Sequence, residues 1–568
     1  MSRKTAIIII IGAFFIFIIA SIFVFKSIGT GGVSIKENTY LVIPLYGNIP
    51  DYTTKENIFS KREPLTIWNF YRAVKLAERD SRIKGIILKV YNPMIGMGKI
   101  EEIISILKDF KKSGKKIYSF LEYGGMRDYM IASVSDKIYM ISTGTLVLKG
   151  FSFEVMFYKG LLEKLGIKAD LLHIGDYKTA SNLFTEDKLT PAHKEEMEYL
   201  LNEFSDYFLK VVSENRKIRK EDVKRIFNHP FLTSEEAKDF SLIDSIAYYD
   251  QMIKDISKPY NKLKPYKKVN RVSFSSYLYG KKFYPKGRNI AIIFAYGQIE
   301  SGQSGYNPLY GEMLGSETLI SAIRKAKKDS SVKAIVLRVD SPGGSGVASD
   351  EILRELKLAA KKKPVVVSMS DLAASGGYWI SMGAKKIVAH TLTLTGSIGV
   401  IAGKFSLKGF YNKLGLNVER VEKEKYAHIF SSTEEFSPEE RKLLYKNIES
   451  FYNKFLKVVS EGRGLSLKEV DSIGRGRVWT GRSALKIKLV DKIGGLDVAI
   501  REASSLAKLG KYYGIKTFPR KRSFLEELFN NNPFFSKINI KKIKANLIPY
   551  KSFEALTIMN IIPELRDK

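Results

Sequence analysis

Two stretches of the chain share one pattern: SRIKGIILKV at residues 81–90 and SVKAIVLRVD at residues 331–340. Each holds a short run of branched apolar residues, IIL or IVL, which is typical of a buried strand in a parallel sheet. Each is followed by a turn and a helical pattern, KIEEIISILKDF at 99–110 or SDEILRELKLAA at 349–360. Strands that alternate with helices in this way predict an α/β fold with largely parallel strands.

The likeness between the two stretches continues along most of the chain, at an offset of about 250 residues (331 minus 81). FLKVVSENR at 208–216, for example, is matched by FLKVVSEGR at 455–463. A repeat of this length indicates a duplicated domain rather than a solenoid. We therefore predict a first repeat at 39–262, a basic linker at 263–287, a second repeat at 288–510 and a tail at 511–568.

The N-terminal region predicts a membrane anchor. Residues 5–25, TAIIIIIGAFFIFIIASIFVF, carry no charge and would span roughly 30 Å as a helix, about the thickness of a bilayer core. A cleaved signal peptide is the alternative, but its apolar region is usually shorter and ends in a small-residue cleavage site. Arg3 and Lys4 precede the run, which favours a cytoplasmic N-terminus and a body outside the cytoplasm. Residues 1–38 would then form a short stub, the anchor and a stalk.

Composition excludes several classes of site. The chain has no cysteine, so disulfides and thiolate nucleophiles are excluded, and its five histidines lack the spacing of a helical metal site. The net charge of +33 could indicate nucleic-acid or lipid binding, but the lysines are scattered and no nucleic-acid motif accompanies them. We expect no metal, no organic cofactor and no nucleic-acid partner.

Three loops of the second repeat carry candidate chemistry: DSPGGSG at 340–346, DLAASGGYW at 371–379 and TGSIG at 395–399. The first follows a strand, and its glycines would let backbone amides approach an oxyanion. The second places a serine among small residues after the strand VVVSMS, as in a nucleophile turn. Taken singly, each loop could equally be an ordinary turn or helix start.

A serine nucleophile needs a general base. Histidine is scarce, and His390 and His428 are the only ones beyond the candidate serine. A lysine can serve instead if burial lowers the pKa of its amine enough to populate the neutral form.

Together, DSPGGS, AASGGYW, TGSIGV and RVWTGRSALKIKLVDKIGG (477–495) resemble the signal peptide peptidase A family, also called protease IV. The resemblance covers the anchor, both repeats and the linker. It implies tandem crotonase/Clp-protease-like α/β repeats, a serine–lysine dyad and a ring- or bowl-like homo-oligomer of four copies.

The resemblance also implies roles for individual residues. The nucleophile falls on Ser375 in AASGG, and the lysine on Lys178 in GDYKTA at 175–180 of the first repeat. Ser397 occupies the position of a serine that hydrogen-bonds the lysine amine. Gly344 and Gly376 match the amides that form the oxyanion hole.

The repeats support a shared site in a second way. Met126 stands in the first repeat where Ser375 stands in the second, and Ala427 falls near the position of Lys178. Each repeat lacks what the other has, so we expect one site assembled across both. Lys425 and His428 lie close to Ala427 and remain alternative bases.

We therefore expect a membrane-bound serine endopeptidase that degrades cleaved signal peptides and similar short apolar peptides. Its body would lie on the periplasmic side of a bacterial inner membrane. The alternatives are a crotonase-type acyl-CoA enzyme, for which an exported body would be out of place, and a non-catalytic membrane scaffold.

Overall fold

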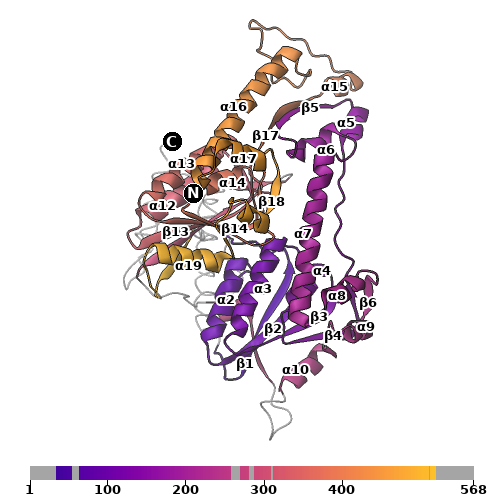
Figure 1. Ribbon diagram of the computed structural model, residues 1–568, viewed down its shortest axis with the longest axis vertical. Helices are drawn as coiled ribbons and strands as arrows, with labels where there is room; N and C mark the ends of the chain where they lie inside the picture. The colour runs from indigo at the N-terminus through magenta and orange to yellow at the C-terminus, as the bar shows by residue number, and fades with distance from the viewer. Residues whose placement is uncertain are drawn as a thin grey trace, which may run out of the picture. The chain divides into compact units, whose positions relative to one another are not determined.

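The computed structural model describes residues 34–53, 63–257, 269–279, 287–308, 311–510 and 512–519 (Figure 1). The predicted anchor at residues 5–25 lies outside the described residues, as do parts of the linker and the whole of the tail beyond residue 519. Within the described ranges, no helix combines the length and the apolar character that crossing a membrane requires.

The first repeat is built around a parallel sheet with strand order β6-β4-β3-β2-β1-β8, in which β7 also pairs with β4 and only β6 runs antiparallel among the described strands. Its strands are β1 (Thr39–Gly47), β2 (Ile83–Pro93), β3 (Lys116–Gly124), β4 (Lys137–Val147), β5 (Lys168–Ile174), β6 (Phe231–Thr233) and β7 (Ser245–Ile246), and β8 (Asn270–Ser273) comes from the linker. Its helices are α2 (Ile67–Arg79), α3 (Met97–Lys111), α4 (Met126–Ala132), α5 (Lys159–Leu165), the 3₁₀ turn η1 (Thr179–Ser181), α6 (Asn182–Thr185), α7 (Pro191–Arg216), α8 (Lys220–Ile226), α9 (Ser234–Asp239) and α10 (Tyr249–Ser257), and α11 (Phe274–Leu278) follows in the linker.

The second repeat has a sheet of order β18-β16-β14-β13-β9-β20, with β15 beside β14 and β19 beside β15. Its strands are β9 (Asn289–Tyr296), β10 (Gln298–Glu300), β11 (Gly305–Asn307), β12 (Gly311–Gly315), β13 (Val332–Ser341), β14 (Val365–Ala374), β15 (Lys386–Ala389), β16 (Leu394–Gly396), β17 (Val400–Ser406), β18 (Val478–Thr480) and β19 (Lys492–Ile493), and β20 (Gly514–Phe518) comes from the start of the tail. Its helices are α12 (Ser316–Lys328), α13 (Gly346–Ala360), α14 (Gly376–Ser381), α15 (Lys408–Lys413), α16 (Pro438–Arg463), α17 (Leu467–Ile473), α18 (Gly481–Lys486) and α19 (Leu496–Leu506). The runs IIL, IVL and VVV form buried parts of β2, β13 and β14, and the alternation of strands and helices confirms the predicted α/β fold.

Equivalent residues of the two repeats make equivalent contacts. The hydroxyl of Tyr129 in α4 donates to the carbonyl of Leu242, and that of Tyr378 in α14 donates to the carbonyl of Leu489, each over 2.8 Å. The long helices α7 and α16 both span 26 residues and both begin with proline after a capping hydroxyl, from Thr190 in the first repeat. Proline at the first helical position loses no intrahelical bond, which is why a Thr-Pro pair can begin α7.

The two repeats share a hydrophobic core. Side chains of a strand alternate between the two faces of its sheet. On β13, Ile335 and Leu337 face the core of the second repeat, under α12 and α13, whereas Ala334 and Val336 pack into the same core as the apolar residues of α2 and α3. This face of the second sheet is therefore covered by α3 of the first repeat together with α19 of the second.

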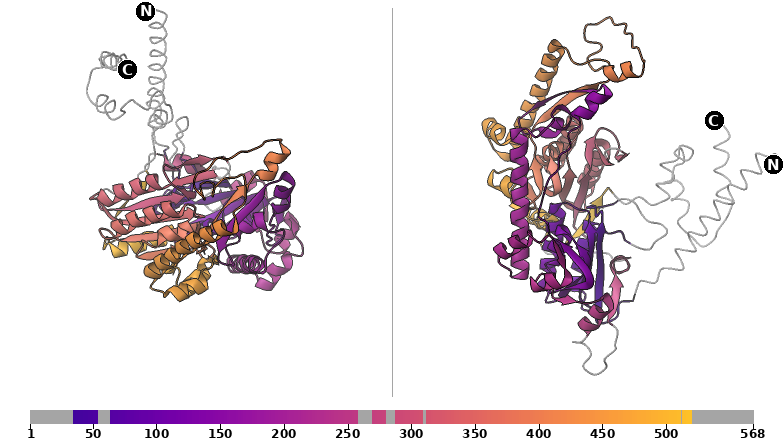
Figure 2. Two further views of the ribbon diagram at one scale, coloured as in Figure 1. Left: turned by 90° about the horizontal axis from the view of Figure 1, so that it is seen from above. Right: turned by 90° about the vertical axis from the view of Figure 1, so that its right-hand side faces the viewer.

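A second junction joins the repeats through backbone hydrogen bonds. Strand β5 of the first repeat pairs antiparallel with β17 of the second, from Ile174 opposite Val400 to Lys168 opposite Ser406. Figure 1 and the right-hand view of Figure 2 show this ribbon beside α5 and α15, away from the first sheet. The pairing brings the loop after β5 against the turn that precedes β17.

Candidate active site

Ser375 stands at a sharp turn between β14 and α14. Strand β14 ends at Ala374 and α14 begins at Gly376, so the serine is the N-cap residue of the helix. Its backbone is held at φ 53° and ψ −119°, and its N–H donates to the carbonyl of Gly396 over 2.9 Å. A residue other than glycine in this region costs on the order of 1–3 kcal/mol, and such strain is common where a nucleophile is presented at the end of a strand.

The loop after β13 touches this turn. A Cβ atom added to Gly343 would lie 2.5 Å from the nitrogen of Gly376 and 2.8 Å from the Cβ of Ser375. One added to Gly344 (φ +142°) would lie 2.1 Å from the carbonyl oxygen of Ile299. Only glycine fits at either position, which explains the paired glycines of DSPGGS.

Two backbone amides near Ser375 are available to a ligand. The bridge between Ile299 and Gly344 uses the carbonyl of Gly343 and the N–H of Ser345, so the N–H of Gly344 lies outside this pairing. Gly376 is the first residue of α14, where N–H groups have no intrahelical acceptor. Paired amides of this kind are suited to stabilising an oxyanion.

Lys178 reaches the second repeat from the loop after β5. Its Nζ donates to the carbonyl oxygen and to the hydroxyl of Ser397, each over 2.9 Å. The side chain is buried, and burial lowers the pKa of its amine to about 8, although the charge of Glu196 acts in the opposite direction. A buried lysine with a lowered pKa can exist as the neutral amine that a general base requires.

Close backbone contacts hold the loop that carries Lys178. The N–H of Tyr177 donates to the carbonyl of Arg475 over 3.0 Å. A Cβ on Gly476 would lie 2.3 Å from the nitrogen of Lys178, and one on Gly399 would lie 3.0 Å from its Cδ. The lysine backbone and stem thus pass against glycines of the second repeat, so the position of the amine depends on contacts between repeats.

All five residues singled out by the sequence line one cavity of about 670 Å³. Its other lining residues come from both repeats and are mostly apolar around the polar groups: Leu183, Met197, Trp379, Val400, Ile401, Phe451 and Phe455 are among them. The cavity therefore combines a hydroxyl, a buried amine and free amides with an apolar wall.

Two lining residues from α7, His193 and Glu196, are not singled out by the sequence. Glu196 is buried, its Oε1 accepts the N–H of Val478 over 2.6 Å, and burial raises the pKa of its carboxyl to about 7. His193 is buried, burial lowers the pKa of its ring, and its Nδ1 has no hydrogen-bond partner among the described residues. The signal was available: both lie on the buried face of α7 with Leu200, where charged residues are unusual.

The alternative bases lie elsewhere. Lys425 has a side chain that is 66% exposed and pairs with Glu439 over 2.6 Å. His428 contacts Glu422 through Nδ1 over 2.5 Å. Neither residue lines the cavity, and Ala427 between them is exposed.

Met126, the first-repeat counterpart of Ser375, begins α4 and packs against the shared core. His390 is buried and its Nε2 lies 3.1 Å from a carboxylate oxygen of Glu102. Within the described part of the chain, no three His, Asp or Glu residues are grouped as they would be to hold a metal ion.

The fold and the cavity suit a serine peptidase, and comparisons with known proteins agree. A model of peptidase family S49 matches residues 109–263 and 357–510, one segment in each repeat. A chloroplastic serine protease SPPA from Arabidopsis thaliana is 34% identical over 84% of this chain and 70% of its own length. Protease 4 of Salmonella typhi is 34% identical over 79% of this chain and 73% of its own, and Protease 4 of Haemophilus influenzae is 30% identical over 89% and 85%.

These matches identify the chain as a serine peptidase, a hydrolase. More particularly, it belongs to peptidase family S49, in the long duplicated form of signal peptide peptidase A or protease IV. Among solved structures, a ClpP1 mutant from Listeria monocytogenes is 16% identical and covers 37% of this chain and 94% of its own, with a TM-score of 0.25. A TM-score this low does not establish a shared fold, so the crotonase/Clp-protease-like assignment of each repeat stays a prediction.

Proposed function

We propose that this peptidase works by a Ser375–Lys178 dyad assembled across the two repeats. The observation that carries the proposal is that both side chains line one cavity, with the lysine amine buried and hydrogen-bonded to Ser397. Each repeat supplies one member of the dyad. A single active site per chain follows.

The reaction follows from the chemistry of these groups. The neutral amine of Lys178 takes the hydroxyl proton as the Ser375 oxygen attacks the peptide carbonyl. The N–H groups of Gly344 and Gly376 donate to the oxyanion of the tetrahedral intermediate. The lysine then gives its proton to the leaving amine, and a water activated by the same lysine hydrolyses the acyl-enzyme.

The substrates we propose are cleaved signal peptides and similar short apolar peptides. The apolar wall of the cavity supports this, since Trp379, Phe451 and Phe455 offer contacts to apolar side chains.

The location and assembly belong to the same proposal. The uncharged run at residues 5–25 and its Arg3–Lys4 flank favour a single-pass inner-membrane protein with its body on the periplasmic side. The resemblance to signal peptide peptidase A favours a homotetramer. Protease treatment of spheroplasts tests the orientation, and a body digested only after lysis would contradict it.

The direct test of the site is labelling with a serine-reactive fluorophosphonate followed by peptide mapping. We expect the label on Ser375 in the full-length protein and no label on Ser375→Ala. A label on another serine, or full peptidase activity in Ser375→Ala, would contradict the proposal.

A further inference from the structure

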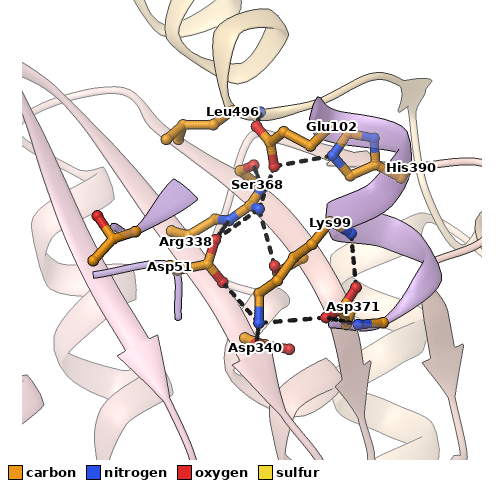
Figure 3. A network of polar contacts seen from close by, with 12 residues as sticks. Asp51, Lys99, Glu102, Arg338, Asp340, Ser368, Asp371, His390 and Leu496 are labelled. Carbon is orange, nitrogen blue, oxygen red and sulfur yellow. Dashed lines mark hydrogen bonds and ion pairs between the residues drawn. The ribbon is translucent and has the colours of Figure 1, made fainter. Parts of the chain in front are cut away.

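A buried network of charged residues lies where α3 of the first repeat packs on the sheet of the second (Figure 3). The first repeat contributes Asp51, Lys99 and Glu102; the second contributes Arg338, Asp340, Ser368, Ser370, Asp371 and His390. We call these nine residues the cross-repeat network. It is set into an otherwise apolar interface, where unpaired charges are costly.

One half of the network surrounds Arg338 on β13. Its guanidinium is fully buried, pairs with Glu102, lies 2.8 Å from Asp51 Oδ1 and donates to Ser368 and Ser370 over 2.9 Å each. This half joins the two repeats without approaching the cavity. These contacts stabilise the interface between the two repeats and have no direct part in catalysis.

The other half surrounds Lys99 on α3. Its Nζ lies 2.6 Å from Asp340 Oδ2, 3.3 Å from Asp371 Oδ2 and 3.9 Å from Asp51 Oδ2. Burial alone would lower the pKa of this amine, but the three carboxylates outweigh it and raise the pKa. Lys99 is therefore a charged lysine, in contrast with Lys178.

Asp340 and Asp371 lie at a register shift between β13 and β14 in the sheet of the second repeat. Val339 of β13 pairs with Met369 of β14, but the next pair is Ser341 with Ala373. Asp340 alone therefore opposes a longer stretch of β14. The Asp340 carboxylate fills part of the interrupted ladder, since its Oδ1 accepts the N–H of Leu372 over 3.2 Å.

Asp371 is tied to the first repeat as well. Its Oδ1 accepts the backbone N–H of Lys99 over 2.7 Å, and its Oδ2 accepts that of Gly96 over 3.0 Å. The carboxylate thus caps the N-terminus of α3 from the other repeat, a favourable place for a negative charge. Lys99 draws Asp340 toward this fixed group.

Both strands lead directly into the proposed site. Asp340 is followed by the loop that contains Gly344, and β14 continues from Asp371 to the turn at Ser375. We propose that Lys99 is a positioning residue, which holds the oxyanion loop and the nucleophile turn in register by bridging Asp340 and Asp371. This inference rests on the proposed Ser375 site.

The bridge acts by charge and by geometry. Without the amine, two carboxylates would face each other in a buried space and repel. Relief of that repulsion would shift the end of β13 relative to β14. A displacement of about 1 Å between catalytic groups can cost about 100-fold in rate, even when the change is remote from the chemistry.

The test is a double-mutant cycle in the full-length protein, with Lys99→Met, Asp340→Asn and the double variant. We expect Lys99→Met to lower kcat by about 100-fold while KM changes less than about threefold, because catalytic alignment rather than binding is lost. In the Asp340→Asn background, Lys99→Met should lower kcat by less than about tenfold, because the amide introduced by Asp340→Asn carries no charge to repel Asp371. Lys99→Arg, which keeps the charge, should retain more activity than Lys99→Met.

Lys115→Met is the matched control. The amine of Lys115 donates to the carbonyls of Ala77 and Asp80, within the first repeat, over 2.6 and 2.8 Å. The Lys115→Met variant therefore removes a partly buried lysine with two hydrogen bonds, but one that contacts neither Asp340 nor Asp371. A loss of kcat in Lys99→Met no greater than in this control would overturn the proposal, as would equal losses in both arms of the cycle.

Folding is monitored by thermal unfolding of every variant. If Lys99→Met does not fold but the double variant does and is active, the neutralising role of Lys99 is supported. If neither folds, Lys99 is required for the fold as such and the positioning role is overturned. Failure of the proposed site itself appears separately, as activity in Ser375→Ala with the cycle unaffected.

Discussion

The amine of Lys178, from the first repeat, donates to the hydroxyl of Ser397, from the second, over 2.9 Å. It also donates to the carbonyl oxygen of Ser397 over the same distance. A neutral amine has two N–H groups and one lone pair. If both N–H groups are used on Ser397, the lone pair is left for the proton of Ser375. Ser397 would in this way fix the direction in which the base acts.

The first prediction concerns the base. We expect Lys178→Met to lower kcat by about 10⁴-fold or more, and to lower it no further in combination with Ser375→Ala, since groups that act as a unit are non-additive. Peptidase assays on the purified full-length variants measure this. Lys425→Met is the control and should stay within about twofold of the unchanged protein, because its amine is engaged by Glu439 at the surface. The reverse order of effects would move the base to the second repeat.

The second prediction separates the hydroxyl of Ser397 from its backbone. Ser397 has φ 50°, a conformation that is strained for any residue with a Cβ, serine and alanine alike. Ser397→Ala therefore removes the hydroxyl but keeps the strain and the carbonyl acceptor, whereas Ser397→Gly also relieves the strain. We expect about a 10- to 100-fold loss of kcat in Ser397→Ala, at or below the low end of the roughly 10²- to 10⁴-fold that a general base itself contributes. Unchanged kcat in Ser397→Ala, with loss only in Ser397→Gly, would show that the backbone conformation and not the hydroxyl matters.

The third prediction is a pH profile. Lys178 must lose its proton to act as a base, and burial lowers the pKa of its amine to about 8. The rate should therefore be low below this pH, fall by about tenfold per pH unit on the acid side, and level off above it. Measurement of kcat/KM from pH 6 to 10 tests this. An optimum on the acid side would be incompatible with a lysine base.

The fourth prediction uses Glu196 to move that profile. The charge of Glu196 raises the pKa of Lys178, against the larger effect of burial. Glu196→Gln keeps an oxygen to accept the N–H of Val478 but removes the charge, so the acid limb should shift to lower pH. Glu195→Gln is the control, because Glu195 lies at the surface on Arg477 and is not in the cavity wall. A shift to higher pH, or equal shifts in both variants, would contradict this account.

The sequence could predict much of this site because its signals are local. Small residues around Ser375 and paired glycines at 343–344 reflect steric demands of two turns, and those demands can be recognised without a structure. The buried strands β2, β13 and β14 are equally local, as continuous branched apolar runs. Alignment of the two repeats alone shows that Met126 replaces the serine in the first repeat and that Ala427 falls near the position of the lysine in the second.

The remaining features depend on contacts between distant segments. Neither the sequence of β5 nor that of β17 predicts that these two strands pair. Their pairing nevertheless places the Lys178 loop against the second repeat. Lys99 looks like any lysine near the start of an amphipathic helix, and only its burial against Asp340 and Asp371 distinguishes it. Glu196 lies at helical spacing from Leu200, which signals burial, but only the packing of α7 shows that it faces the cavity.

The last prediction concerns whether the second repeat can supply its own base. Sequence comparison suggests that Ala427→Lys would restore a lysine at the position equivalent to Lys178. In the structure, Ala427 is exposed in a turn, and the segment before it, residues 417–424, forms no strand, whereas β5 precedes Lys178 and pairs with β17. We therefore expect the full-length Lys178→Met/Ala427→Lys variant to remain as inactive as Lys178→Met. Recovery of more than about tenfold in kcat, roughly 1.4 kcal/mol of transition-state stabilisation, would show that the second repeat can bring its own amine to Ser375. Lys178→Arg provides a further comparison, because it restores a cation at the native position but not a base that can be neutral near pH 8, and it too should stay inactive.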